Sequence, residues 1–225
     1  MKKITLLLSL IAFLAAPAVK AQSERSISNF NSINVSGPMT VYITMGENNN
    51  LRIEADKDDL DNILTEVKSN TLEISSKALK SKKDVIIYVT ARELTYVGIT
   101  GSGKVIGRSV IKSPSLQVNL TGSGNMALDV GVNDLKVDVT GSGNLVLTGQ
   151  TQDLKMRVSG SGDADALKMH AQKADIHVSG SGNALVNVNG DLTGSITGSG
   201  DIAFTGIPNI NNINLRGSGK LRPAF

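Results

Sequence analysis

The tripeptide Gly-Ser-Gly is the pattern in this 225-residue sequence that most readily suggests chemistry, because glycine-rich loops bind phosphate groups in many proteins. A phosphate-binding loop also needs a following Lys-Ser or Lys-Thr pair, or the N-terminus of a helix, and neither follows here. We therefore interpret the glycines as structural corners and predict no cofactor. The fourteen glycines are Gly101, Gly103, Gly122, Gly124, Gly141, Gly143, Gly160, Gly162, Gly180, Gly182, Gly198, Gly200, Gly217 and Gly219.

The residue after each tripeptide is polar, and such a row could in principle bind calcium. Its members are Lys104, Asn125, Asn144, Asp163, Asn183, Asp201 and Lys220. Calcium prefers several carboxylate oxygens, and only Asp163 and Asp201 are acidic, two repeats apart. Asn and Asp also favour turn conformations and bond to nearby backbone amides. The sequence therefore favours a stacked structural ladder over a calcium site.

The two histidines are the next candidates for a metal site. Zinc takes three or four protein ligands, and His170 and His177 have only Asp165 and Asp175 near them in the sequence. Nothing in the spacing fixes these four side chains around one ion. We predict no metal site, and we expect His177 on a solvated surface.

One pair of carboxylates could hydrolyse a glycosidic bond. Asp163 and Asp165 are two residues apart and would share one face of a strand, as two catalytic carboxylates must. No aromatic platform for a sugar accompanies them, because the repeats contain only Phe204 and Phe225. We expect a protein without enzymatic activity and keep a polysaccharide-active enzyme as the least favoured alternative.

The spacing of the tripeptides predicts the fold. Successive copies are 21, 19, 19, 20, 18 and 19 residues apart, and such a steady period indicates a solenoid. Apolar Leu135, Val137 and Val139 alternate with polar residues before one corner, which is the pattern of a strand with one buried face. A second short apolar strand follows each corner, and a polar turn closes the coil. We predict an all-β, single-domain β-solenoid of about seven 19-residue coils.

Residues 22–100 lack the tripeptide but contain strand-like segments. Gly37-Pro38 resembles a degenerate first corner, and residues 56–68 carry apolar residues at helical spacing, which allows a short helix. No linker rich in proline or glycine separates this region from the repeats. We predict one domain over residues 22–225, in which residues 22–100 cover the N-terminal end of a stack formed by residues 101–225.

The first 21 residues predict export. Lys2 and Lys3 precede a 13-residue apolar run that ends at Ala16, and small residues up to Ala21 match a signal-peptide cleavage site. The run is too short for a comfortable membrane span, and no later segment is long enough to form one. We expect cleavage after Ala21 and a location in the periplasm, on the outer-membrane surface or outside the cell.

Cleavage also changes the charge. It removes three of the 23 lysine and arginine residues and no acidic residue, so the mature chain carries 20 residues of each sign. The net charge of +3 therefore disappears, and nucleic-acid binding has no support. The sequence contains no cysteine, which excludes disulfides, thiolate metal sites and a lipoprotein anchor.

The position three residues past each tripeptide is the most informative candidate for binding. It should point outward, because its neighbours already fill the interior by alternation, and yet it is mostly apolar. We call Ile106, Ala127, Val146, Leu185 and Ala203 the apolar row; Asp165 and Arg222 interrupt the series. It is either a partner or self-association face, or a surface covered by other parts of the chain.

The Ile33–Thr44 opening, the Leu72–Ser75 strand and the repeated Gly-Ser-Gly-Asn/Asp corners resemble the "putative auto-transporter adhesin, head GIN domain" family, over about residues 30–215. The resemblance implies a β-helix-like fold and an envelope or surface location in Bacteroidetes, and it supplies no catalytic or ligand residues. We expect an adhesion or interaction module whose protein or glycan partner is unknown. The alternative is a periplasmic structural or sensory module.

Overall fold

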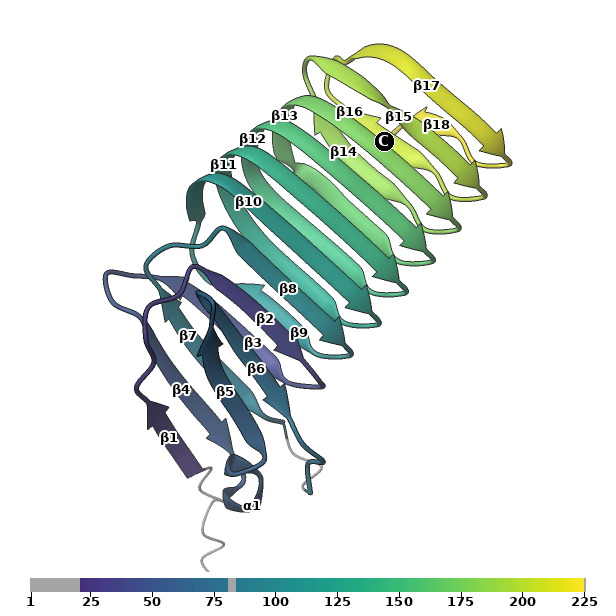
Figure 1. The fold of residues 1–225 in the computed structure, drawn as a ribbon. Helices are drawn as coiled ribbons and strands as arrows, with labels where there is room; N and C mark the ends of the chain where they lie inside the picture. The colour runs from purple at the N-terminus through teal and green to yellow at the C-terminus, as the bar shows by residue number, and fades with distance from the viewer. Residues whose placement is uncertain (1–20, 81–83, 225) are drawn as a thin grey trace, which may run out of the picture.

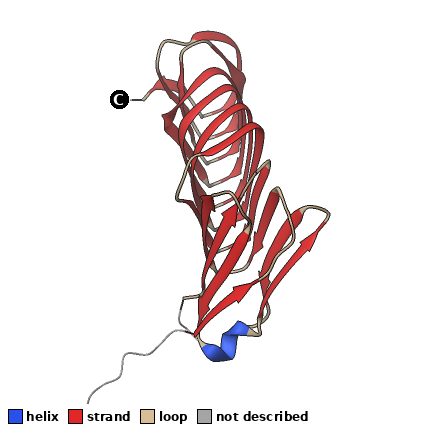
Figure 2. Ribbon diagram, turned by 90° about the vertical axis from the view of Figure 1, so that its left-hand side faces the viewer, coloured by secondary structure: helices blue, strands red, loops and turns tan. Residues whose placement is uncertain are grey.

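The protein is a long rod built almost entirely from β-strands (Figure 1). The structure is a computed structural model, and it describes residues 21–80 and 84–224. The strands stack along the rod and belong to one continuous sheet. Seen after a quarter turn, the rod is narrow over the repeats and wider at its N-terminal foot, where a short helix lies (Figure 2).

The repeat region forms in-register parallel coils, as predicted. Gly122, Gly141, Gly160, Gly180, Gly198 and Gly217 align through successive strand pairs, so each corner stacks on the one before. The strands are β8 (Tyr96–Gly101), β9 (Lys104–Gly107), β10 (Ile111–Gly122), β11 (Asn125–Gly141), β12 (Asn144–Gly160), β13 (Asp163–Gly180), β14 (Ala184–Val188), β15 (Asp191–Gly198), β16 (Ile202–Thr205), β17 (Asn209–Gly217) and β18 (Leu221–Pro223).

The far side of the three central coils differs from the expected polar turn. β11, β12 and β13 run without a break from one corner to the next, because backbone pairing between coils continues around the bend. Thr151 at this bend is buried, and its hydroxyl donates to the carbonyl of Asn133 at 2.9 Å. In these three coils a smooth bend that keeps its pairing replaces the separate turn, whereas β14 and β15 are separate strands, as are β16 and β17.

The core is a set of apolar columns inside the rod. Val118, Val137, Met156 and Ile176 occupy successive positions of one column, and none of them is exposed. Burying such side chains stabilises the fold by roughly 1.5–3 kcal/mol each. Because each coil contributes only one layer, stability depends on contact between neighbouring coils.

The N-terminal region continues the stack and then closes it. Gly37 lies against Gly101, and the strands before and after Gly37 pair in parallel with β8 and β9, so Gly37-Pro38 forms a first corner as predicted. Antiparallel pairs then finish this end of the rod. The elements are β1 (Ala21–Arg25), β2 (Ser32–Ser36), β3 (Thr40–Met45), β4 (Asn50–Ala55), α1 (Lys57–Leu60), β5 (Ile63–Lys68), β6 (Thr71–Ser76) and β7 (Ile86–Ala91).

The helix suggested over residues 56–68 is mostly wrong. Only Lys57–Leu60 is helical, and Ile63–Lys68 is a strand that forms a hairpin with β6. Ser69 and Asn70 both have positive φ, at 46° and 64°, which is the requirement of a tight two-residue hairpin turn. Pairing with β6 overrides the helical spacing of the apolar residues.

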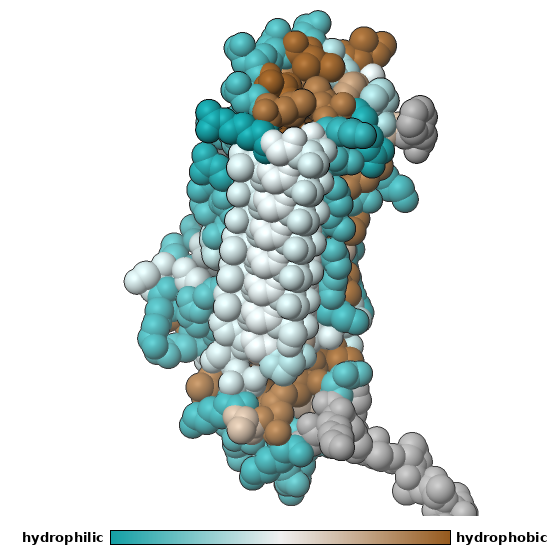
Figure 3. All heavy atoms as spheres, turned by 90° about the vertical axis from the view of Figure 1, so that its right-hand side faces the viewer, coloured by the Kyte–Doolittle hydropathy of each residue, from teal (hydrophilic) through white to brown (hydrophobic). Residues whose placement is uncertain are grey.

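The C-terminal end of the rod is open. β17 pairs only with β15, and Ile207, Ile210 and Leu215 are exposed, at 86%, 48% and 51%. Hydrophobic surface gathers at this end in the space-filling view, above the pale column of glycine and serine corners (Figure 3). The predicted signal peptide, apart from Ala21, lies outside the described residues, and within them no helix has the length and apolar character needed to span a membrane.

Candidate functional site

The corners explain why glycine recurs seven times. At the first glycine of each tripeptide φ lies between 108° and 121°, a region that other residues rarely adopt. A side chain would also collide with the coil below: a Cβ on Gly122 would lie 2.6 Å from the carbonyl oxygen of Gly101. The corner amides are already used, because Ser142 and Gly143 both donate to the Gly122 carbonyl at 2.9 Å. The amides of Ser142 and Gly143 therefore hold one coil to the next.

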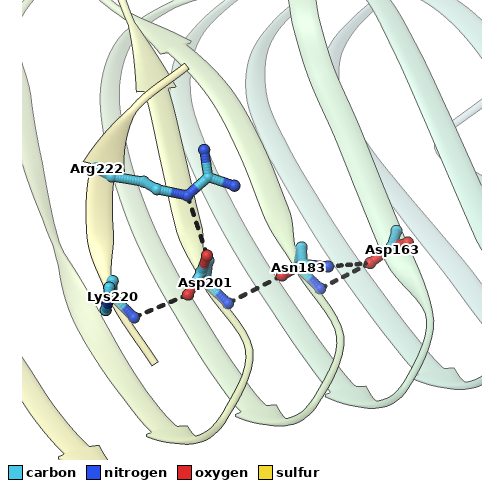
Figure 4. Close-up of polar contacts among 5 residues, drawn as sticks. All are labelled: Asp163, Asn183, Asp201, Lys220 and Arg222. Atoms are coloured by element: carbon cyan, nitrogen blue, oxygen red, sulfur yellow. Dashed lines mark hydrogen bonds and ion pairs between the residues drawn. The ribbon is translucent and has the colours of Figure 1, made fainter. Parts of the chain in front are cut away.

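The polar residues after the corners form a hydrogen-bonded ladder between coils (Figure 4). Asn183 donates its backbone amide and its side-chain amide to Oδ1 of Asp163, at 2.9 and 2.8 Å. The backbone amide of Asp201 donates to Asn183 Oδ1 at 3.0 Å, and that of Lys220 to Asp201 Oδ1 at 2.9 Å. Each side chain therefore supports the next coil.

Asp201 anchors the last coil. Its carboxylate accepts a hydrogen bond from Arg222 Nε at 3.0 Å. The hydrogen bond from Arg222, followed by the bond from the Lys220 amide, holds the pKa of Asp201 below its usual value. Oδ1 of Asp163 and both carboxylate oxygens of Asp201 are therefore engaged in structural bonds.

The other aspartate of the predicted pair is also held locally. Asp165 Oδ1 accepts the backbone amide of Leu167 at 3.0 Å. This contact lies beside the register shift where β13 carries one residue more than β12. Asp163 and Asp165 thus stabilise a corner and a bulge.

The two histidines lie at separate places. His170 is exposed at the far bend, where its Nδ1 is 3.1 Å from the side-chain amide of Asn187. His177 lies on the strand before the corner, between Arg157 and Ser195. Among the described residues, no three potential ligands gather to form a metal site.

His177 belongs to a Ser-His-Asp contact that the sequence analysis missed. Its Nδ1 is 2.9 Å from Ser195 Oγ, and its Nε2 is 3.2 Å from Asp175 Oδ1. The expectation of a simply solvated histidine is therefore incomplete. The signal was available, because Ser195 follows His177 by 18 residues, the same distance that separates the corners at Gly180 and Gly198.

A Ser-His-Asp contact alone does not make a hydrolase. Acyl transfer needs backbone or side-chain donors aimed at the developing oxyanion. Ser195 lies within the paired β13–β15 ladder, where the amides on either side are used between coils. The His177 and Asp175 side chains are 37% and 42% exposed, and both border a small hollow that Lys155 and Arg157 also line. We interpret the three residues as a surface hydrogen-bond chain.

The members of the apolar row lie opposite one another on successive paired strands. Pairing connects Ile106 to Ala127, Ala127 to Val146, Val146 through Asp165 to Leu185, and Leu185 to Ala203. For Ala127, Val146 and Leu185 the positions on either side along the strand are buried, so these three members face outward. Neighbouring positions on stacked strands lie about 4.8 Å apart, so the row follows the rod axis.

Exposure varies along the apolar row. Val146 is 42% exposed, and Ile106, Ala127 and Leu185 are half-buried. The expectation of an exposed side chain is wrong for Ala203, which is only 2% exposed. Its small side chain lies in register between Leu185 and Arg222, two larger residues.

Two tyrosines extend the row into the N-terminal region. Tyr42 pairs with Ile106, and Tyr88 pairs with Tyr42. Their ring centroids are 5.5 Å apart and the ring planes differ by 20°. Sequence reasoning missed them, although Tyr42 follows the Gly37-Pro38 corner at the same offset as Ile106 follows its own corner.

Arginines cover the tyrosine pair. The guanidinium carbon of Arg108 is 3.8 Å from the centre of the Tyr42 ring and 5.2 Å from that of Tyr88. Arg52 lies 4.2 Å from the Tyr88 ring, and it also forms an ion pair with Glu54 at 3.0 Å. The row therefore changes from aliphatic to aromatic and cationic toward the N-terminal foot.

A shallow hollow lies near the N-terminal end of the apolar row. It forms where the small Ala127 lies between the larger Ile106 and Val146, and Lys104, Asn125 and Asn144 border it. Its apolar floor and amide rim suit a shallow contact with a ligand or partner.

Fold and site together define a class: a β-solenoid with structural corners and an extended outward face. The family model for "Putative auto-transporter adhesin, head GIN domain" matches residues 29–208, and the chain belongs to this family. A comparison with curated proteins finds no match.

Solved structures share the fold over nearly the whole chain. A "putative adhesin" from Bacteroides fragilis is 23% identical, with a TM-score of 0.86, and the match covers 91% of this chain and 96% of that one. A "putative lipid binding protein" from Parabacteroides distasonis is 24% identical, with a TM-score of 0.75 and coverages of 93% and 98%. A "putative adhesin" from Parabacteroides merdae is 18% identical, with a TM-score of 0.74 and the same coverages.

Proposed function

We propose that this chain is a non-enzymatic, exported interaction module of the cell envelope, which binds its partner through the apolar row and the tyrosines beside it. The observation that carries the proposal is the course of the row. Apolar side chains follow one another over successive coils on an open face, and Val146 remains 42% exposed. Solenoids characteristically bind through such extended surfaces.

The surroundings of the row support this function. The N-terminal region stacks on the end of the coils and continues the row through Tyr42 and Tyr88, so it leaves Val146 exposed. Family membership adds an adhesin-like context. Asp163 and Asp165 accept structural hydrogen bonds, and His177 contacts Ser195 and Asp175 at the surface.

Two pairs of lysine substitutions test the proposal. We expect Val146→Lys with Leu185→Lys to weaken binding of the labelled chain at least tenfold, because two charges would have to be desolvated in the contact. The matched control is Leu64→Lys with Val110→Lys, at apolar residues off the row that are 43% and 40% exposed. Binding is measured on cells of the source bacterium and on arrays of immobilised proteins and glycans.

Self-association is measured in parallel by light scattering. If only the Val146→Lys, Leu185→Lys variant loses binding or no longer forms an oligomer, the result supports the apolar row as the interface. If the two double variants behave alike, the apolar row is not the binding interface. Circular dichroism shows whether each variant remains folded.

A further inference from the structure

Arg108 lies at the edge of the row with its charge unbalanced. It is exposed, and among residues 21–80 and 84–224 no carboxylate lies within ion-pair distance of its guanidinium. Arg52 differs, because Glu54 neutralises it at 3.0 Å. Asp129 lies two residues beyond Ala127 on the neighbouring coil, and Glu54 accepts the Tyr88 hydroxyl at 3.4 Å, but neither forms an ion pair with Arg108.

The backbone around Arg108 is held on both sides. Its amide donates to the Ile43 carbonyl at 2.7 Å, and the hydroxyl of Ser109 accepts the Met45 amide at 2.7 Å. The guanidinium is positioned over Tyr42 and Tyr88. An arginine stacked on aromatic rings keeps its N–H groups available for a planar oxyanion.

A second cation lies on the same face of the same segment. Lys104 is exposed after its corner, and Ile106 follows two residues later on the same side of β9. Lys104 and Ile106 also border the hollow at Ala127. A ligand on this surface therefore meets a cation, an apolar floor and then a stacked guanidinium.

The neighbouring residues favour a sugar chain over a membrane. Asn125 and Asn144 provide amides beside the apolar floor, which match a ring with C–H faces and peripheral hydroxyls. Membrane-surface binding relies on large apolar side chains that enter the bilayer. At this end of the row Ile106 and Ala127 are half-buried, and the Arg108 guanidinium lies over Tyr42 and Tyr88, which leaves Val146 as the exposed apolar side chain beside the hollow. We propose that Lys104, Arg108 and Tyr42 form a binding site for an acidic glycan, one that carries carboxylate or sulfate groups. This inference rests on the proposed function and names the class of ligand.

Binding of polygalacturonate and chondroitin sulfate to the mature chain tests the proposal, with dextran as the neutral comparison. We expect binding of the acidic polymers only, weakening as salt is raised. Lys104→Gln with Arg108→Gln should lower their affinity at least tenfold, and Tyr42→Ala should also lower it by removing the support of Arg108. The matched control, Lys155→Gln with Arg157→Gln, removes the same charge from exposed positions before another corner.

Three results would overturn the acidic-glycan site. These are equal losses in both charge pairs, equal binding of dextran, and binding to vesicles of phosphatidylglycerol but not to either acidic polymer. The failures remain distinguishable. If Val146→Lys with Leu185→Lys abolishes binding to cells while the Lys104/Arg108 pair leaves it unchanged, the row stands and only the acidic-glycan site fails. If neither pair changes binding to cells, the proposed function fails as well.

Discussion

Gly141→Ala is expected to lower the melting temperature of this protein by roughly 6–12 °C. Gly141 has a φ of 111°, which costs a residue with a side chain about 1–3 kcal/mol. The new Cβ would also lie 2.5 Å from the Gly122 carbonyl oxygen. That oxygen cannot move freely, because it accepts the amides of Ser142 and Gly143. Together these effects should cost about 3 kcal/mol or more.

Ser142→Ala is the matched control, because Ser142 is exposed in the same corner. Its substitution should change the free energy of unfolding by less than about 0.5 kcal/mol. Thermal unfolding followed by circular dichroism compares the two variants. Similar melting temperatures for both would show that the corners tolerate side chains and that the stack differs from the one described.

Leu145→Ala is expected to destabilise the protein by about 2–5 kcal/mol, because it leaves a cavity in a closely packed column. Leu145 is 1% exposed and lies between Met126 and Ala164 of the neighbouring coils. Val146→Ala, one residue further along, should cost less than about 1 kcal/mol, because Val146 is 42% exposed.

Urea unfolding of the two alanine variants measures the difference directly. The comparison tests the inside–outside alternation on which the apolar row depends. A larger loss for Val146→Ala than for Leu145→Ala would place Val146 in the core and would contradict an outward row.

The repeat unit was predictable because it is encoded locally. A fixed period and a two-residue alternation specify strands, corners and the inward side chains, and an offset from a corner specifies which residues share a row. The stacking of Gly37-Pro38 beneath Gly101 followed from the same rule. Applying that offset to this corner would also have found Tyr42.

Other features depend on neighbours that the local pattern does not specify. The strand at Ile63–Lys68 exists because β6 pairs with it, although its apolar spacing also suits a helix. Ala203 is buried because it is small and lies between Leu185 and Arg222. The position of Arg108 over Tyr42 and Tyr88 depends on the register between β9 and β3, which the local sequence pattern does not specify.

Protease treatment of intact cells that express the full chain tests most directly whether this family member acts as an outward-facing interaction module. Detection with an antibody to the mature chain reports whether the protein is cleaved. Our account predicts that the chain is cleaved or released from whole cells, while a periplasmic marker stays intact. Protection until the envelope is opened would contradict it, and would instead place the apolar row against a partner inside the envelope.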